Sequence, residues 1–468
     1  FYRLQLELDA HGNRIELAYD GTRLAQITDA VGRIVRVAWS GDHIKSFSVT
    51  GDAQAGSHTF FRYEHDDRGD LVGVVDAAGN RTGFAYQDDE PMGPRRLTKH
   101  IHRDGLTFHY RYDDPGRCVE TWGDHQDAAR LGLADGLPQV LADGVTPARG
   151  IHHVRLAYLP DGYREVTDAR GLHRFDVNEL GALDLAVVGG GVYSFTMDRQ
   201  GLLETFVDPL GHMSTWSRSE DGKSFAFTNP LSDTTVMERD DATNTVTLDS
   251  PTGYRLVRSL DAAGRLLSAH DDGGEIIRYE YDPRGLVLRA TMPDGAVTEF
   301  AYDHHGNRTL VVEPDGSRKT ITYDSIGRPR QVTDATGAVT SFHYDVRGGL
   351  TSVTASDGSA EHYDFDVGGR VARYVDEDGG VTAIEWGHLH RVLSVTKANG
   401  EVTAYRYDRG GRLMTVENGA GEVHRHHYDP GGRLVGESTF DGRRLRYGRD
   451  LNGALETFTR GDEGEVQL

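Results

Sequence analysis

Histidine clusters are the residues of this chain that could most readily carry chemistry. His424, His426 and His427 form the densest cluster, and His304–His305 and His152–His153 form pairs. A metal site needs several converging ligands and partners that hold them in place. His424 and His426 can share one strand face, but we find no further ligand in the neighbouring sequence. We therefore interpret all these histidines as solvated strand residues and predict no metal site.

Acidic residues and a cysteine are the other candidates for catalysis. Asp282–Leu286 reads Asp-Pro-Arg-Gly-Leu and Asp208–Gly211 reads Asp-Pro-Leu-Gly, and both stretches have the composition of a turn. Cys118 is the only cysteine, so an internal disulfide is excluded, and we interpret it as a small buried side chain. Gly-x-Ser-x-Gly, His-Glu-x-x-His and phosphate-loop motifs do not occur. The sequence predicts neither a catalytic centre nor a cofactor.

A fixed period of 21 residues organises the second half of the chain. One phase of this period holds aromatic residues, and two further phases hold glycine. The aromatic phase comprises Tyr281, Tyr302, Tyr323, Tyr344, Phe365, Trp386, Tyr407 and Tyr428. The glycine phases include Gly295, Gly316, Gly358 and Gly379 in one and Gly306, Gly327 and Gly348 in the other, which is interrupted only at His390. Such regularity predicts a repeat array in which each unit packs mainly on its neighbours.

Each unit contains two turn signals and therefore two strands. The first signal is Asp-x-x-Gly, as in Asp303–Gly306, where aspartate starts a type I turn and glycine accepts a positive φ. The second is a pair such as Asp294–Gly295, which is typical of hairpins. We expect positive φ at Gly295, Gly316 and Gly358. The spacing leaves strands of roughly six to eight residues.

Apolar and polar side chains alternate along these strands, which indicates a sheet with one apolar face. Two residues before the aromatic phase lie Tyr279, Phe300, Ile321, Phe342, Tyr363, Ile384 and Tyr405, and the return strands add Val311, Val332, Val353, Tyr374, Val395 and Val416. The places between them are polar, as at Glu280, Thr322, Asp364 and Arg406. The fold class is therefore all-β, an antiparallel hairpin array. We expect the aromatic residues on its concave side.

The spacing divides the chain into four stretches. Residues 1–122 carry the same turns with irregular spacing, and residues 151–252 carry degenerate repeats. Residues 123–150 lack alternation and are expected to form an inserted loop with one helical turn, whereas residues 253–468 follow the regular period. About 44 strands would form a ribbon that cannot stay flat, so we expect it to curl around a cavity as one continuous shell.

The bulk composition argues against some partners. The formal net charge is −22, with 73 acidic and 51 basic side chains, which disfavours nucleic acid and anionic membranes. We find no run of about 18 apolar residues that would span a membrane, and the start FYRLQLELD does not resemble a signal peptide. We expect the chain to be a piece of a longer protein.

Two stretches identify the repeat by resemblance. Tyr-Asp-x-x-Gly-Arg-Leu occurs at Tyr407–Leu413 and Tyr428–Leu434, and it resembles the YD repeat of bacterial Rhs proteins. Arg117–Gly123 also resembles a stretch of Rhs cores. Related arrays occur in the BC component of insecticidal Tc toxins and in teneurins. The resemblance implies a hollow, spiral β-sheet shell, or cocoon.

The resemblance also implies a function. Bacterial members of the family are polymorphic toxins that hold a C-terminal toxin segment inside the shell. They are made in the cytoplasm and exported or injected, often through a type VI secretion spike with PAAR or adaptor proteins, and an immunity protein accompanies the toxin. Asp282–Leu286 shares the letters of the family's aspartyl cleavage motif, but it lies in regular phase as a turn. We therefore expect a structural shell and not an enzyme; the alternative is an extracellular adhesion or glycan-binding repeat protein.

Overall fold

The computed structural model describes residues 3–9, 13–29, 32–50, 57–87, 95–160, 162–178, 182–188, 191–429, 432–449, 455–461 and 465–467. Gly12, Pro430–Gly431 and Gly453, which belong to the predicted turns, lie outside the described residues. Within this part of the chain the structure has 42 β-strands and one short 3-10 helix. The predicted all-β class is confirmed.

The strands of the first half are β1 (Leu6–Leu8), β2 (Arg14–Asp20), β3 (Arg23–Thr28), β4 (Ile34–Ser40), β5 (His43–Thr50), β6 (Ser57–His65), β7 (Leu71–Asp76), β8 (Arg81–Tyr86), β9 (Leu97–Ile101), β10 (Thr107–Tyr112) and β11 (Cys118–Asp124). The 3-10 helix η1 (Ala128–Leu131) follows. Then come β12 (Ile151–Tyr158), β13 (Arg164–Thr167), β14 (Leu172–Val177), β15 (Leu183–Val188), β16 (Gly191–Met197), β17 (Leu203–Val207), β18 (Met213–Arg218), β19 (Ser224–Thr228), β20 (Thr234–Asp240) and β21 (Thr245–Asp249).

The second half continues with β22 (Arg255–Leu260), β23 (Leu266–Asp271), β24 (Gly274–Tyr281), β25 (Val287–Thr291), β26 (Val297–Tyr302), β27 (Arg308–Val312), β28 (Arg318–Tyr323), β29 (Pro329–Thr333), β30 (Val339–Tyr344), β31 (Leu350–Thr354) and β32 (Ala360–Phe365). It ends with β33 (Val371–Val375), β34 (Val381–Trp386), β35 (Val392–Thr396), β36 (Val402–Tyr407), β37 (Leu413–Glu417), β38 (Val423–Tyr428), β39 (Leu434–Ser438), β40 (Arg444–Arg449), β41 (Leu455–Arg460) and β42 (Glu465–Gln467).

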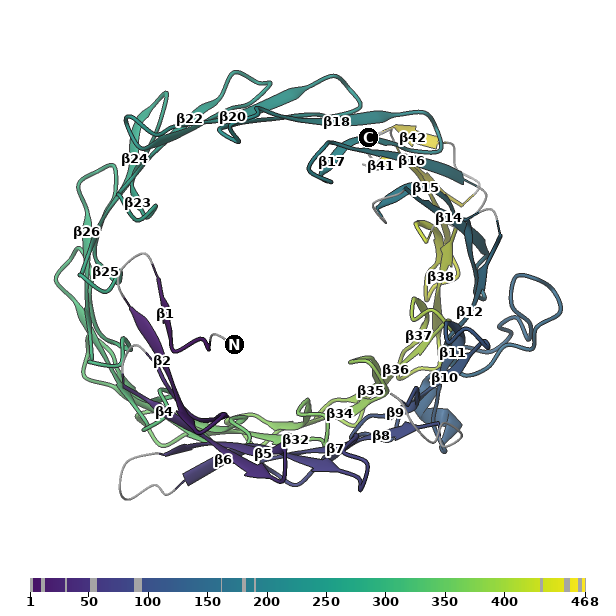
Figure 1. Cartoon of the computed structure of the whole chain (residues 1–468), viewed down its shortest axis with the longest axis horizontal. Helices are drawn as coiled ribbons and strands as arrows, with labels where there is room; N and C mark the ends of the chain where they lie inside the picture. The colour runs from purple at the N-terminus through teal and green to yellow at the C-terminus, as the bar shows by residue number, and fades with distance from the viewer. Residues whose placement is uncertain are drawn as a thin grey trace.

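The sheet is a single antiparallel meander, as the alternation predicted. Each strand pairs with the strand before it and the strand after it, from β1 to β42. Figure 1 shows that the ribbon winds into an open ring of more than one turn, so that β2 lies inside β25 and β26 and the last strands overlap β16 to β18. We call the earlier turn of the spiral the first layer and the later turn the second layer. Hydrogen bonds between these two layers join residues that are 239 to 284 positions apart in sequence. About that length of chain therefore makes one turn of the spiral.

Turn geometry explains the glycine phases. The Gly306 amide donates to the Asp303 carbonyl at 3.1 Å, and Gly306 has φ +78°. The second turn of the unit has the same form, because the Gly295 amide donates to the Met292 carbonyl at 3.0 Å and Gly295 has φ +82°. Both are short loops in which a type I turn precedes a left-handed glycine. The predicted positive φ is confirmed at Gly295, Gly316 (+83°) and Gly358 (+90°).

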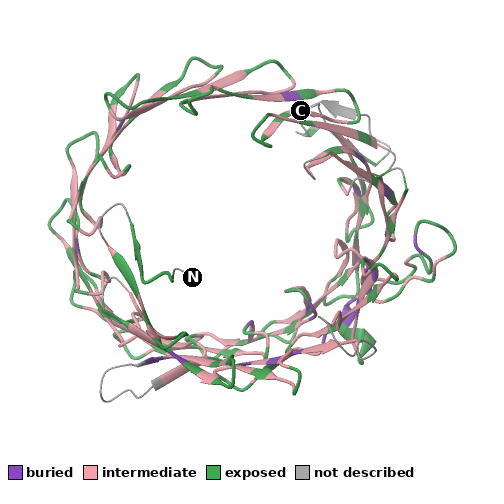
Figure 2. Cartoon of the chain, viewed as in Figure 1, coloured by how far each residue is buried: buried purple, intermediate pink, exposed green. Residues whose placement is uncertain are grey.

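The wall is one sheet thick, and its faces differ as predicted. The aromatic residues of the repeat are half-buried, whereas Glu280, Thr322, Asp364 and Arg406 are exposed. Figure 2 shows that few residues anywhere in the ring are fully buried. The chain exposes 27,684 Å² in total, against roughly 17,000 Å² for a compact protein of this mass. The position of the aromatic face on the concave side stays a prediction.

Candidate functional site

The aromatic phase does more than fill the apolar face. The Tyr302 hydroxyl donates to the Val287 carbonyl at 2.8 Å, 15 residues earlier in the chain. The same bond is made by Tyr19, Tyr86, Tyr112, Tyr281, Tyr323, Tyr344, Tyr407 and Tyr428, and by the indole N–H groups of Trp39 and Trp386. Each such bond fastens one hairpin to the preceding one. Sequence reasoning interpreted these positions as an apolar ladder, and the hydroxyl group is the signal that it missed.

The arginine of the motif fastens the hairpin in the other direction. Arg328 Nε donates to Asp324 Oδ2 at 2.6 Å within its own turn, and Arg328 Nη1 donates to the Asp345 carbonyl of the next unit at 3.2 Å. Its guanidinium also stacks on the Tyr344 ring at 4.7 Å. Arg265, Arg370 and Arg412 repeat this arrangement. The Tyr-Asp-x-x-Gly-Arg motif thus links neighbouring units in both directions: its tyrosine bonds to the preceding unit and its arginine to the following one.

The inserted stretch after β11 ties the two layers of the spiral together. It contains the expected helical turn, η1, and then runs beside β36. The Ala134 amide donates to the Tyr407 carbonyl, and the Tyr407 amide donates to the Gly132 carbonyl, both at 2.8 Å. Arg409 Nη1 donates to the Gly150 carbonyl at 2.8 Å. We call this contact region, formed by residues 100–173 of the first layer and 366–412 of the second, the junction.

Most of the fully buried residues in the described part of the chain lie in the junction. Leu106, Leu131 and Ile151 form a buried apolar cluster, and Leu106 and Ile151 have no exposed surface. Buried polar residues are concentrated beside it, namely Glu120, His153, Asp168, His173, Arg370, His388 and Asp408. A one-layer sheet elsewhere buries little, so this region is where the shell has a core.

An ion-pair network crosses the junction. Asp104 accepts a hydrogen bond from His388 Nδ1 at 3.1 Å, across 284 residues, and lies 3.7 Å from Arg370 Nη2. Burial favours a neutral Asp104, but the bond from His388 and the charges of His388 and Arg370 prevail and lower its pKa to about 2. The turn that carries His388 keeps the left-handed geometry without glycine, with φ +55° at Leu389 and +61° at His390. Such a strained turn persists only where its surroundings fix it.

The histidine pair of the junction is only partly solvated: the interpretation was wrong for His153, which is buried, whereas His152 is half-buried. His153 is buried, its Nε2 lies 2.9 Å from Glu120 Oε1, and its Nδ1 accepts from the Arg149 amide. His152 Nε2 lies 3.0 Å from Arg391 Nη2, and because arginine only donates, this nitrogen accepts. Both imidazoles are therefore neutral. The inserted sequence folds back onto His153 through the Arg149 amide, and Arg391 and Arg409 of the second layer contact His152. The local alternation could not reveal either contact.

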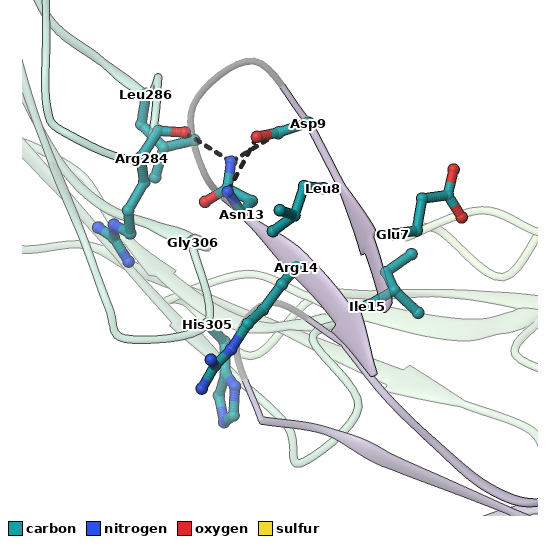
Figure 3. Close-up of a pocket in the computed structure, with 10 residues that line it drawn as sticks. All are labelled: Glu7, Leu8, Asp9, Asn13, Arg14, Ile15, Arg284, Leu286, His305 and Gly306. Atoms are coloured by element: carbon teal, nitrogen blue, oxygen red, sulfur yellow. Dashed lines mark hydrogen bonds between the residues drawn. The ribbon is translucent and has the colours of Figure 1, made fainter. Parts of the chain in front are cut away.

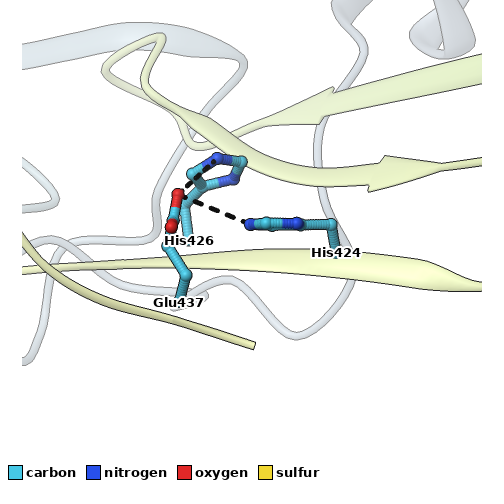
Figure 4. A group of neighbouring side chains, drawn as sticks. All are labelled: His424, His426 and Glu437. Carbon is cyan, nitrogen blue, oxygen red and sulfur yellow. Dashed lines mark ion pairs between the residues drawn. The ribbon is translucent and has the colours of Figure 1, made fainter. Parts of the chain in front are cut away.

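The second histidine cluster was also misinterpreted in part. His427 is exposed as expected, but the side chains of His424 and His426 are only 19% and 16% exposed. Figure 4 shows that both rings converge on Glu437 from the neighbouring strand β39. Each Nε2 lies 3.4 Å from Glu437 Oε1. The structure thus brings together a His-His-Glu group for which sequence reasoning found no third ligand.

A cleft of about 480 Å³ separates the hairpin of β1 and β2 from two turns of the second layer (Figure 3). Asn13 Nδ2 bridges it by donating to the Arg284 carbonyl at 3.1 Å. Asp282 lies in the adjoining turn, where Oδ1 accepts from the Arg284 and Leu286 amides at 2.9 Å and Oδ2 accepts from Arg284 Nε. Both carboxylate oxygens therefore serve the turn, and Asp208 makes the corresponding turn bonds to Leu210 and His212.

Cys118 is half-buried rather than buried, which corrects the expectation for this residue. Its Sγ lies 3.7 Å from the Glu120 carbonyl, and burial raises the pKa of the thiol. A thiol with a raised pKa is a poor nucleophile near neutral pH.

Comparisons with known proteins agree with this architecture. The RHS Repeat family matches residues 261–297, 323–360 and 388–423. The chain therefore contains RHS repeats, as the Tyr-Asp motif predicted. Its sequence is 28% identical over 215 residues to the probable deoxyribonuclease RhsB of Dickeya dadantii, a match that covers 44% of this chain and 14% of RhsB. The chain thus spans only a small part of that relative's length.

A solved structure has the same fold. The Photorhabdus luminescens Tc holotoxin pore superposes with a TM-score of 0.61 at 13% identity, over 97% of this chain and 26% of the holotoxin chain. At that identity the match concerns the fold alone, and it confirms the expected spiral shell. In the described part of the chain, we find no helix with the length and apolar character needed to cross a membrane.

Proposed function

We propose that this chain forms part of the wall of a hollow Rhs shell, and that this shell encloses a toxin segment of the same polypeptide. The observation that carries the proposal is the curled, one-layer sheet with an exposed area of 27,684 Å². A half-buried apolar face of this extent favours association with another surface. Enclosed cargo would cover it without exposing it to other proteins.

The relatives support a role in toxin delivery. RhsB is a probable deoxyribonuclease, and the Photorhabdus structure is a toxin pore. We infer that any toxin activity belongs to a cargo segment and that this segment of wall is not itself an enzyme. Export or injection through a type VI secretion spike, with an adaptor and an immunity protein, is part of the same proposal and rests on the resemblance to Rhs effectors.

The occupied aromatic rings weigh against the adhesion alternative. A sugar-binding platform needs free aromatic faces, but Tyr281, Tyr344 and Tyr428 are each covered by an arginine at 4.7 to 5.0 Å. Their hydroxyls are also engaged with the backbone. These contacts favour a role for the rings in joining the units of a wall.

Protease protection of cargo tests the proposal in the natural full-length protein. Deletion of residues 302–322 removes one repeat unit and moves the turn of His388 away from Asp104, so the two layers lose their alignment. We expect this deletion to expose the cargo to added protease. Asp282→Asn and His427→Gln, which alter exposed or turn positions, should leave the cargo protected.

The opposite pattern would refute the container role. If the unit deletion left cargo fully protected while Asp282→Asn abolished toxin release, this segment would act as a protease. Absence of any protected cargo in the parent protein, together with binding of the shell to glycans, would favour adhesion.

A further inference from the structure

The His-His-Glu group interrupts the apolar pattern of the repeat. His426 occupies the phase that holds Tyr405 in the preceding unit, and Glu437 occupies the phase of Val416. In the earlier units these two phases hold the apolar pairs Ile384 and Val395, Tyr363 and Tyr374, Phe342 and Val353, Ile321 and Val332, and Phe300 and Val311. His426 and Glu437 are directly cross-strand partners, as those pairs are. One unit therefore replaces a packing pair with two metal-ligand residue types at the same place.

The surroundings leave this group without full hydrogen bonding. His424 Nε2 is buried and makes no hydrogen bond, although it lies 3.4 Å from Glu437 Oε1 at ion-pair distance. A buried polar atom that makes no hydrogen bond destabilises the folded state, so this group is unfavourable as a purely structural contact. The Phe440 and His424 rings pack edge to face, with 5.4 Å between ring centroids.

The distances suit a tetrahedral cation. One ligand atom of each residue lies within 4.8 Å of the other two, and each imidazole Nε2 lies 3.4 Å from Glu437 Oε1. Zinc bonds of 2.0–2.1 Å in tetrahedral geometry place neighbouring ligands about 3.4 Å apart. The two histidine–glutamate spacings already match, and only the spacing between the two imidazoles must close.

A second residue holds the carboxylate in position. The Tyr447 hydroxyl, on strand β40, donates to Glu437 Oε2, the oxygen that does not face the histidines. Outer hydrogen bonds of this kind orient the ligands of metal sites. Three adjacent strands thus contribute to one preformed group.

We propose that His424, His426 and Glu437 bind a Zn²⁺ ion through the two Nε2 atoms and a carboxylate oxygen, with a fourth position open to water or another ligand. The ion joins β38 to β39 and replaces the apolar contact that the other units make there. The site is independent of any enclosed cargo. The two imidazole nitrogens are borderline donors, which suit Zn²⁺ better than the oxygen-preferring Ca²⁺ or Mg²⁺.

Zinc titration of this chain against a chromogenic chelator tests the site. The double variant His426→Tyr with Glu437→Val restores the pair of the preceding unit, so it should fold and lose the site. Glu437→Gln keeps the shape and removes the charge. We expect one zinc ion fewer per chain, or an affinity weaker by at least about 100-fold, in both variants, and a 10–100-fold weakening in Tyr447→Phe. Bound Co²⁺ should give the visible absorption of a tetrahedral site in the parent only.

His427→Gln is the matched control because His427 lies on the same strand but is exposed and points to the other face. It should bind zinc as the parent does. Equal zinc stoichiometry and affinity in the parent and the restored-pair variant would overturn the proposal, as would a Co²⁺ spectrum that the variant retains. In that case the group is a buried ion pair without a metal.

Discussion

The regular wall and the junction use the same motif to different effect. In the wall, Arg328 bonds Asp324 in a turn where the two side chains are 30% and 24% exposed. In the junction, Arg370 occupies the same place in the repeat, but its side chain is 7% exposed and it also faces Asp104 of the other layer. The wall is held by many weak, local and repeated contacts. The junction is held by a few buried contacts between residues far apart in sequence.

This difference indicates where the shell is vulnerable. In a repeat array, stability is approximately a sum over units and their interfaces, so the loss of one wall contact stays local. The junction has no such redundancy, because among the described residues it contains the main buried apolar cluster. A change there should release one layer of the spiral from the other.

The largest expected effect separates the two arginines. Arg370→Gln leaves Asp104 and Asp366 without their buried cation, which should lower the free energy of unfolding by about 3–5 kcal/mol. Arg328→Gln at the equivalent wall position should lower it by about 1 kcal/mol or less. Urea titration of both variants measures this difference. Equal losses would mean that the junction is not a distinct stabilising region.

Two glycines sharpen the comparison next. A Cβ at Gly316 meets no atom within 4 Å. Gly316→Ala should therefore lower the free energy of unfolding only through the strain of its positive φ, by about 1–2 kcal/mol. A Cβ at Gly150 would lie 1.9 Å from the Gly123 carbonyl oxygen, so Gly150→Ala must also displace backbone. We expect a loss of about 2–4 kcal/mol, from strain added to overpacking. Protease cleavage after residue 123 should increase in Gly150→Ala only; cleavage at the same rate in both variants would contradict this.

The wall could be predicted from the sequence because its determinants are local and repeated. The period of 21 gave the turns, the positive φ at Gly295 and the alternation of faces. The hydroxyl bond of Tyr302 was not predicted, since an aromatic residue at an apolar phase has a sufficient packing role without it. Extending the two apolar phases by one unit would have reached His426 and Glu437, and that signal was available in the sequence.

The junction could not be predicted in the same way. Asp104 and His388 meet because one turn of the spiral happens to bring their hairpin ends together, and no short-range pattern encodes that length. The burial of His153 follows from the inserted loop, whose fold depends on the second layer. Contacts of this kind arise from the curvature of the whole array, which is set by many small twists between strands.

Removal of one tyrosine hydroxyl tests the hydrogen bonds that link neighbouring units of the wall. Tyr302→Phe removes the donor to the Val287 carbonyl and should cost about 0.5–1.5 kcal/mol. Phe365 lies in the same phase and has no hydroxyl, so Phe365→Tyr is the reciprocal variant and should be neutral or stabilising by about 1 kcal/mol. Hydrogen exchange of the strands on either side reports both effects locally. If Tyr302→Phe destabilised the junction as much as its own unit, the effect of the tyrosine hydrogen bond would not be local.

The smallest expected effect depends on pH and again separates the two regions. Burial lowers the pKa of His152 from 6.5, and the nearby charges of Arg391 and Arg170 lower it further, against the opposing effect of Asp408 and Asp168. Burial lowers the pKa of His153 in the same way, although Glu120 opposes it.

A lowered histidine pKa means that the unfolded chain binds the proton more readily than the folded chain. The junction should therefore keep its full stability above about pH 6.5 and lose it progressively as the pH falls below that value. Asp104 does not cause this loss, because its pKa is lowered to about 2 and it stays ionised throughout.

We expect the protection of backbone amides from hydrogen exchange, relative to their intrinsic exchange rates, to fall at residues 132–152 between pH 7 and pH 5, with little change in β26 to β31. His152→Asn tolerates the left-handed φ of +48° and does not titrate, so it should reduce the pH dependence. An unchanged pH dependence in that variant would assign the effect to His153 or to the histidines around Asp104 instead, and equal sensitivity of the wall would remove the distinction between the two regions.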